Sequence, residues 1–371
     1  MGNEQVSSMI SGDFDPAAGE RATDQQDQKQ ELAAEEMDVV KKEEEKGDVS
    51  DNSNTAAAAV VVAALHSAAV ASVANAPPRD AETDPDTKTR LAISQIPINQ
   101  HKPSLAANTY LEFPFSLDAH KVFLKEFQDN WGYGLRHDYY SDTRKIAIRM
   151  GTVFHSIFAY NVGDQVANDL RIRKYHPEKL IADFAAQIKQ RTDSPVDFAE
   201  DGSWHSPDVA FAHIGAYYPG VVFEISFSEK KLPLQELAQQ YFRGSDGEVQ
   251  VVVGFDIEFP DAKKGKFMVW KKKETKHGKI KAHLVLEEEF QHSDGKLNKD
   301  CKGIYLNLAD FCPARMIPDD VKPIIAQRTY LGHDTGIHIP AFELCNFLTM
   351  AHTNHQLAMA HARAQQQKQQ A

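Results

Sequence analysis

The spacing of apolar residues changes from helical to strand-like along the chain. Four segments carry apolar side chains three and four positions apart, the spacing of an amphipathic helix, and the end of the chain is also expected to be helical. These segments are 117–127, 150–170, 177–190 and 233–243, followed by 341–362. Shorter runs that alternate or are continuously apolar predict strands. They are 195–199, 208–213, 221–227, 249–255, 267–270, 281–286 and 303–308. The stretch 91–136 is otherwise expected to be an irregular or partly helical lead-in.

The order of these elements predicts one α/β domain with a mixed β-sheet flanked by helices. The run 249–255 is almost continuously apolar, as expected for a strand that is covered on both faces. We place the domain at 91–340, with its core at about 140–312. A C-terminal helix and a Gln-rich tail are expected at 341–371.

Composition separates the first 90 residues from the rest. Residues 1–90 hold 19 acidic and 8 basic residues, a net charge of −11, which leaves only −1 of the chain's −12 for 91–371. The segment has one aromatic residue, Phe14, so it cannot bury enough apolar area to offset its chain entropy. We predict a disordered, acidic and Ala-rich tail. The run 56–76 is as long as a membrane span, but it is mostly Ala, so we expect low-complexity chain and no membrane contact.

Cysteine use points to a reducing compartment. The three cysteines, Cys301, Cys312 and Cys345, show no paired spacing. A disulfide framework or a Cys-rich zinc site is therefore not expected, and an intracellular location, nuclear or cytoplasmic, fits best.

Two acidic residues stand out among the predicted strands. Asp208 opens one strand after a proline, and Glu224 lies sixteen residues later in the middle of a strongly apolar one. A buried Glu needs a cation, a metal or a donor. Two carboxylates on neighbouring strands can converge on one divalent ion such as Mg²⁺ or Mn²⁺, which can activate water toward a phosphodiester. The same pattern also fits an Asp that caps a strand start and a Glu that faces solvent.

The residues around this acid pair resemble a known family. The stretches 206–211 and 218–230, with Tyr241 and Gly244 before the strand 249–255, are similar to the core of the restriction-endonuclease-like, PD-(D/E)XK, superfamily. Within it the chain resembles poorly characterised fungal proteins with an E-x-S variant of the motif. The resemblance covers about 140–312, and its specific part is some fifty residues.

The resemblance implies a magnesium-dependent nuclease ancestry. Asp208 and Glu224 match the family's two metal-binding acids, whereas Ser226 stands where the family has a lysine that helps to activate the attacking water. Lys230 is the nearest candidate to replace that lysine. A third acid of such sites often comes from an upstream helix; Glu178 is a candidate, although a Glu at a helix N-terminus also compensates the helix dipole.

A lysine-rich stretch follows the predicted core. Nine lysines lie within 263–281, with Glu274 as the only acid, and they include the run Lys271, Lys272 and Lys273. On a hairpin these lysines could follow a phosphate backbone of DNA or RNA. They could equally form a solvated edge that prevents strand pairing with other chains.

Two hypotheses follow for the function, beside a third class, a structural or interaction protein led by the acidic tail. The first is a divalent-metal-dependent nuclease-like protein, active or degenerate, that hydrolyses phosphodiester bonds with Asp208 and Glu224 as metal ligands. The second is a non-catalytic module on the same fold that binds nucleic acid or protein and keeps the carboxylates as structural groups. Ser226 favours the second hypothesis, and the acid pair favours the first.

Overall fold

The structure is a computed structural model of the whole chain. It describes residues 109–130, 136–150, 152–191, 195–199, 201–227, 234–258 and 263–370. All of them belong to one compact unit, Asp80–Ala371. The predicted tail at 1–90, with its Ala-rich run, lies outside the described residues. Within the described part of the chain, no helix combines the length and the apolar character that crossing a membrane requires.

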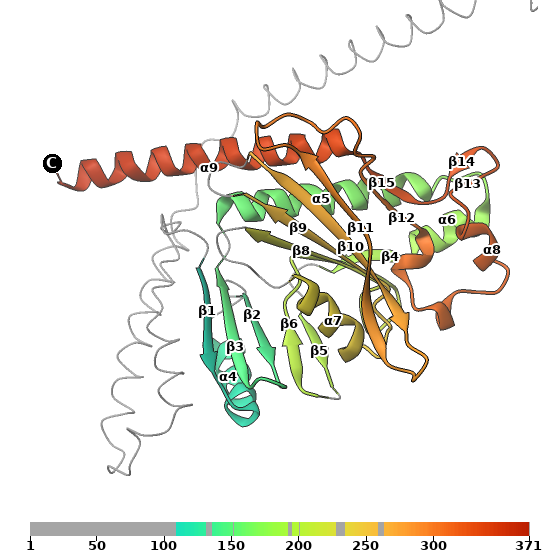
Figure 1. Cartoon of the computed structure of the whole chain (residues 1–371), viewed down its shortest axis with the longest axis horizontal. Coiled ribbons are helices and arrows are strands. Elements are labelled where there is room, and N and C mark those ends of the chain that lie inside the picture. The colour runs from blue at the N-terminus through green and yellow to red at the C-terminus, as the bar shows by residue number, and fades with distance from the viewer. Residues whose placement is uncertain are drawn as a thin grey trace, which may run out of the picture. The chain divides into compact units, whose positions relative to one another are not determined.

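A six-stranded mixed sheet forms the centre of this unit (Figure 1). Its strand order is β11-β10-β9-β8-β7-β4. The strands are β4 (Ile188–Arg191), β7 (Val209–His213), β8 (Val221–Phe227), β9 (Val251–Ile257), β10 (Gly265–Glu274) and β11 (Ile280–Gln291). β7 and β8 are antiparallel, whereas β8 and β9 are parallel and are joined through the helix α7 (Leu234–Gly244). A parallel pair needs such a crossover, and the predicted mixed α/β sheet is confirmed.

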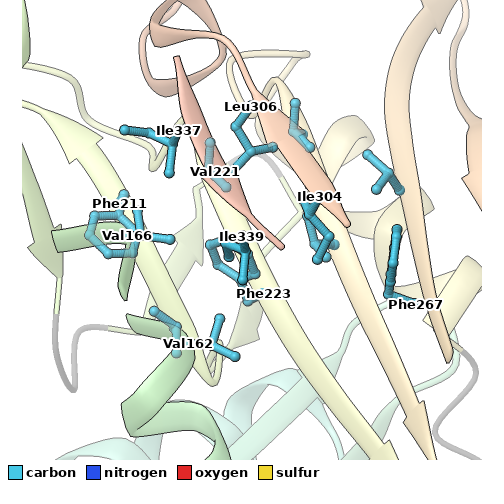
Figure 2. Packing of buried hydrophobic residues seen from close by; sticks show 14 of the residues in the cluster. Val162, Val166, Phe211, Val221, Phe223, Phe267, Ile304, Leu306, Ile337 and Ile339 are labelled. Atoms are coloured by element: carbon cyan, nitrogen blue, oxygen red, sulfur yellow. The ribbon is translucent and has the colours of Figure 1, made fainter. Parts of the chain in front are cut away.

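Helices cover both faces of this sheet. The helix α7 covers one face. The opposite face is covered by α5 (Val153–Arg173), α6 (Lys179–Ala186) and α9 (Ala341–Gln370). Figure 2 shows Val162 and Val166 of α5 close to Phe211 and Phe223 of the sheet, in the larger buried cluster. Val222 belongs instead to a second cluster with α7. Because neighbouring side chains on a strand point to opposite faces, Glu224 shares the α7 face with Val222.

A second sheet has five strands in the order β1-β3-β2-β6-β5. Its elements are β1 (Thr109–Pro114), α4 (Leu117–Asn130), β2 (Arg136–Tyr140), β3 (Lys145–Met150), β5 (Val196–Phe198) and β6 (Ser203–His205). The helix at 117–127 is thus confirmed, but the expectation of an irregular lead-in is wrong for β1. In β3 the apolar Ile146 and Ile148 alternate with Lys145 and Arg149, whereas β2 has no aliphatic residue, so only β3 carries a strand pattern.

The segment after β11 forms small separate elements. They are β12 (Ile304–Leu306), η2 (Leu308–Phe311), η3 (Ala314–Met316), α8 (Lys322–Ile325), β13 (Thr329–Tyr330), β14 (His333–Asp334) and β15 (Ile337–Ile339). The predicted strand at 303–308 is present as β12, but it pairs with β15 rather than with the central sheet. Its apolar residues still join the larger cluster, where Figure 2 labels Ile304 and Leu306.

One helix boundary differs from the prediction. The helix expected over 177–190 ends at Ala186, and Ile188–Arg191 continue as β4, which pairs with β7. Pairing with a distant strand overrides the local helical pattern here. At the other end of this helix, the carboxylate of Glu178 accepts a hydrogen bond from the Leu180 N–H at 3.2 Å, so Glu178 caps the N-terminus, the position at which a Glu also compensates the helix dipole.

The close approach of η2 to the start of β8 gives a first prediction. A Cβ at Gly220 would lie 2.2 Å from the backbone carbon of Phe311, so Gly220→Ala forces the two segments apart. We expect a loss of about 3 kcal/mol in the free energy of unfolding, measured by urea denaturation. As a control, Gly295→Ala meets no atom within 4 Å and adds only the strain of a φ of +81°; we expect about 1 kcal/mol. Equal losses would contradict the packing.

Candidate functional site

The structure brings Asp208 and Glu224 together. Asp208 immediately precedes β7, and Glu224 lies on β8, in the register that pairs Val209 with Phe223. The Ile225 backbone N–H, next to Glu224, donates to Asp208 Oδ2 at 2.5 Å. The Asp208 side chain is 1% exposed and the Glu224 side chain 0%. The convergence expected from the sequence is therefore present, but in a buried position.

An arginine from the second sheet holds one of these acids. Arg149, on β3, donates from Nη1 to Glu224 Oε2 at 2.7 Å. The same guanidinium contacts Asp138 of β2 through Nε at 2.8 Å and Nη2 at 3.0 Å. This bidentate contact depends on the planar guanidinium group, which Lys lacks. Arg149 thus lies between two buried carboxylates, one from each sheet.

The other acid is held by a second arginine and a histidine. Arg136, on β2, donates from Nη1 to Asp208 Oδ1, and His155 Nε2 lies 3.1 Å from the same oxygen. On α7, the hydroxyl of Tyr241 donates to Glu224 Oε1 at 2.7 Å. Each of the four carboxylate oxygens of Asp208 and Glu224 therefore contacts a donor group of the protein itself.

The segment that carries Asp208 is fixed by the same groups. The carbonyl of Ser206 accepts hydrogen bonds from both Arg136 and Arg149. The Ser206 N–H donates to Asp138 Oδ1 at 2.9 Å, and its hydroxyl donates to the carbonyl of His137 at 2.9 Å. The five residues Arg136, Asp138, Arg149, Asp208 and Glu224 are called the ion cluster below.

The charges of the ion cluster balance when Glu224 carries a proton. Burial, which outweighs the opposing effect of Arg149 and is reinforced by the neighbouring Asp208 and Asp138, raises the pKa of Glu224 to about 8. Burial also acts on Asp138, but Arg149 outweighs it and lowers its pKa to about 2. Arg136 and His155 likewise outweigh burial and hold the pKa of Asp208 well below its usual value. At neutral pH the cluster thus has two carboxylates, two guanidiniums and one neutral acid.

A divalent ion does not fit this arrangement. Mg²⁺ and Mn²⁺ need free carboxylate oxygens, whereas those of Asp208 and Glu224 all face protein donors. Among the described residues, no three His, Cys, Asp or Glu side chains are grouped so that they could hold a metal ion. Binding of magnesium or manganese stays a prediction, and it requires Arg136 or Arg149 to move away.

Of the two remaining residues proposed for the site, one lies on the same strand as Glu224 and the other lies outside the described part of the chain. Ser226 is buried on β8, two positions after Glu224, and its register partner is Asp256 on β9. Lys230 falls within 228–233, outside the described residues. Its proposed role in catalysis therefore stays a prediction.

The three lysines proposed to bind nucleic acid are not equivalent. Lys271 Nζ lies 2.8 Å from Asp310 Oδ1, and Lys272 donates to the carbonyl of Gly247. Lys273 is exposed and lies directly opposite Lys281 of β11. Two of the three are thus already engaged within the chain.

Sequence reasoning missed the cations of the site. A buried Glu in a strand needs a partner, and Arg149, in the otherwise apolar run 146–150, is the kind of residue that could supply one. That signal does not identify which acid the arginine meets, because the two strands are 75 residues apart in the chain.

The comparisons with known proteins add no relative. No family model matches the chain, and a search of curated proteins finds no match.

Removing Arg149 tests the ion cluster. Arg149→Met leaves Asp138 and Glu224 buried without their shared cation, and we expect a loss of about 3–5 kcal/mol in the free energy of unfolding. The matched control is Arg243→Met, because Arg243 pairs with Asp142 at 3.4 Å in an exposed position; its loss should be about 0.5 kcal/mol. Urea denaturation measures both. A loss for Arg149→Met no greater than that of the control would contradict the cluster.

The proton on Glu224 gives a pH dependence. Between pH 4.5 and about 8 the unfolded chain releases a proton from Glu224 that the folded chain retains, so this group's contribution to stability falls as the pH rises through that window. Glu224→Gln cannot titrate. The stability of the variant relative to the unchanged protein should therefore increase from pH 4.5 to pH 8, as measured by urea midpoints. A constant difference, or a decrease, would show that Glu224 is ionised in the fold.

Proposed function

We propose that this chain is a non-catalytic nucleic-acid-binding module on a restriction-endonuclease-like fold. The main support for the proposal is that each carboxylate oxygen of Asp208 and Glu224 contacts a hydrogen-bond donor of the protein itself. In this arrangement the acid pair is a structural group that joins two sheets, and the binding surface lies elsewhere.

The architecture supports the fold part of the proposal. A mixed sheet flanked by helices, with two acids that meet from adjoining strands, is what the resemblance to the PD-(D/E)XK superfamily leads one to expect. The strand β8 also carries the E-x-S sequence, with Glu224 and Ser226 on the same face.

Four features support the absence of catalysis. A scissile phosphate must reach the catalytic groups, but the side chains of Asp208 and Glu224 are buried. A protonated Glu224 is a poor ligand for a metal ion. Ser226 cannot supply the positive charge of the lysine that it replaces. Arg149 cannot act as a base, because Asp138 and Glu224 raise its already high pKa against the opposing effect of burial.

The lysine content supports a nucleic-acid partner. Nine lysines and one acid within 263–281 concentrate positive charge on the hairpin β10–β11 of a chain whose net charge is −12. Phosphate contacts by lysine need no particular base sequence.

The rival function is a metal-dependent nuclease, and the convergence of the two acids favours it. For this function Arg136 and Arg149 must leave Asp208 and Glu224, and a divalent ion must replace their charge. An ion that binds the folded state raises its melting temperature. The nuclease should therefore be stabilised by a divalent ion, whereas the non-catalytic module should not.

A metal titration separates these functions. We expect that millimolar Mg²⁺ or Mn²⁺ leaves the melting temperature of the full chain unchanged, and that no cleavage of plasmid DNA or of single-stranded DNA or RNA exceeds that of the variant Asp208→Asn. Thermal unfolding and gel assays with equal amounts of both proteins make the measurement. Cleavage by the unchanged protein that Asp208→Asn abolishes would establish the nuclease instead.

A further inference from the structure

The hairpin β10–β11 extends beyond the sheet that it belongs to. β9 pairs with β10 only as far as Lys271, whereas β10 and β11 remain paired to Glu274 and Ile280. Residues 272–282 therefore form a two-stranded ribbon without a third strand, which is called the β-arm below. Figure 1 shows the two orange strands continuing past the ends of their neighbours.

The β-arm is held in one conformation. Its turn is closed by hydrogen bonds from Thr275 N–H to the Lys279 carbonyl at 2.8 Å and from Gly278 N–H to the Thr275 carbonyl at 2.9 Å. Its base is fixed by the side-chain amide of Gln239 on α7, which donates to the Ile280 carbonyl at 3.0 Å and accepts from the Ala282 N–H at 2.9 Å. The arm can thus present its side chains to a partner without ordering a loop first.

The charge of the β-arm is not balanced within the described part of the chain. The arm has five lysines and one acid, Glu274. Lys273 and Lys281 are direct cross-strand partners, and like charges in this position are destabilising. No ion pair joins a described acid to these two lysines, to Lys276 or to Lys279. The lysines nearer the sheet do have partners: Lys264 lies 2.8 Å from Glu289, Lys266 3.2 Å from Glu287, and Lys271 2.8 Å from Asp310.

The shape of the arm selects among polyanions. A two-stranded ribbon fits the major groove of B-form DNA, which is about 12 Å wide. The major groove of an RNA duplex is deep and too narrow for side chains to read. The arm has no Arg, Asn or Gln, whose planar side chains read base edges by paired hydrogen bonds, and its lysines are flexible point charges, so we expect its contacts to be chiefly to phosphates.

We propose that the β-arm enters the major groove of duplex DNA and that its four unpaired lysines contact the phosphates without sequence preference. This inference rests on the proposed nucleic-acid-binding function and names its surface and its ligand. Lys272 is not among the four, because it fastens the base of the arm to Gly247.

The salt dependence of binding tests the inference. Fluorescence anisotropy of a labelled DNA duplex with the full chain, in EDTA, should give a plot of log K against log salt with a slope of about −3.6 for four phosphate contacts. The double variant Lys273→Gln/Lys281→Gln should reduce the magnitude of that slope by about 1.8. The matched control Lys299→Gln/Lys302→Gln removes the same charge from exposed positions and should leave the slope unchanged.

Three further results decide the identity of the surface and the ligand. Lys273→Arg/Lys281→Arg should retain binding, and an RNA duplex of equal length should bind more weakly. Equal slopes for the two glutamine variants would show a general effect of net charge and overturn the arm as the surface. Equal affinity for the RNA duplex, or displacement of DNA by polyglutamate at equal charge concentration, would overturn duplex DNA as the ligand.

The test is independent of the acid pair. EDTA removes divalent ions, so the binding measured is not carried by a metal site at Asp208 and Glu224. A normal salt slope together with metal-dependent cleavage would overturn the absence of catalysis and leave the arm as the DNA contact. DNA binding whose salt slope is the same for the arm variant and for the Lys299/Lys302 control would overturn the arm alone, whereas no binding of DNA or RNA would overturn the proposed nucleic-acid-binding function as well.

Discussion

The guanidinium of Arg149 determines how the two sheets of this protein meet. It comes from β3 of the five-stranded sheet, contacts Asp138 on the neighbouring strand and reaches Glu224 in the middle of the six-stranded sheet. A buried ion pair adds little to stability compared with apolar packing, but breaking it leaves charges that the interior cannot solvate. The position of β3 relative to β8 is therefore constrained by hydrogen-bond geometry as well as by hydrophobic contacts.

The balance of charge around Arg149 also decides what the acid pair can do. With two carboxylates, two guanidiniums and a protonated Glu224, the cluster is neutral and every oxygen of Asp208 and Glu224 has a donor. A pair of acids on adjoining strands is thus compatible with two opposite roles. The cations that surround the pair, rather than the spacing of the acids, distinguish a metal site from a structural link.

The sequence predicts the parts of the fold whose pattern is local. The strands β8 and β9 and the helix α7 between them follow from continuous apolar runs and from Pro233 and Gly244. The second sheet does not, because β2 and β3 place Arg136, Asp138 and Arg149 inward, where their partners come from distant segments. The meeting of Asp208 with Glu224 follows from strand spacing, but the arginines depend on contacts that no local pattern encodes. Likewise the lysine-rich stretch is visible in the sequence, while its division into paired lysines and the free lysines of the β-arm requires the register of β10 with β11.

The most direct test is a crystal structure of the full chain grown with Mn²⁺, whose anomalous scattering locates the ion. We predict that Arg149 contacts Glu224 and Asp138, that Arg136 contacts Asp208, and that no manganese peak lies between Asp208 and Glu224. A manganese ion coordinated by both acids, with the two arginines displaced, would contradict this prediction.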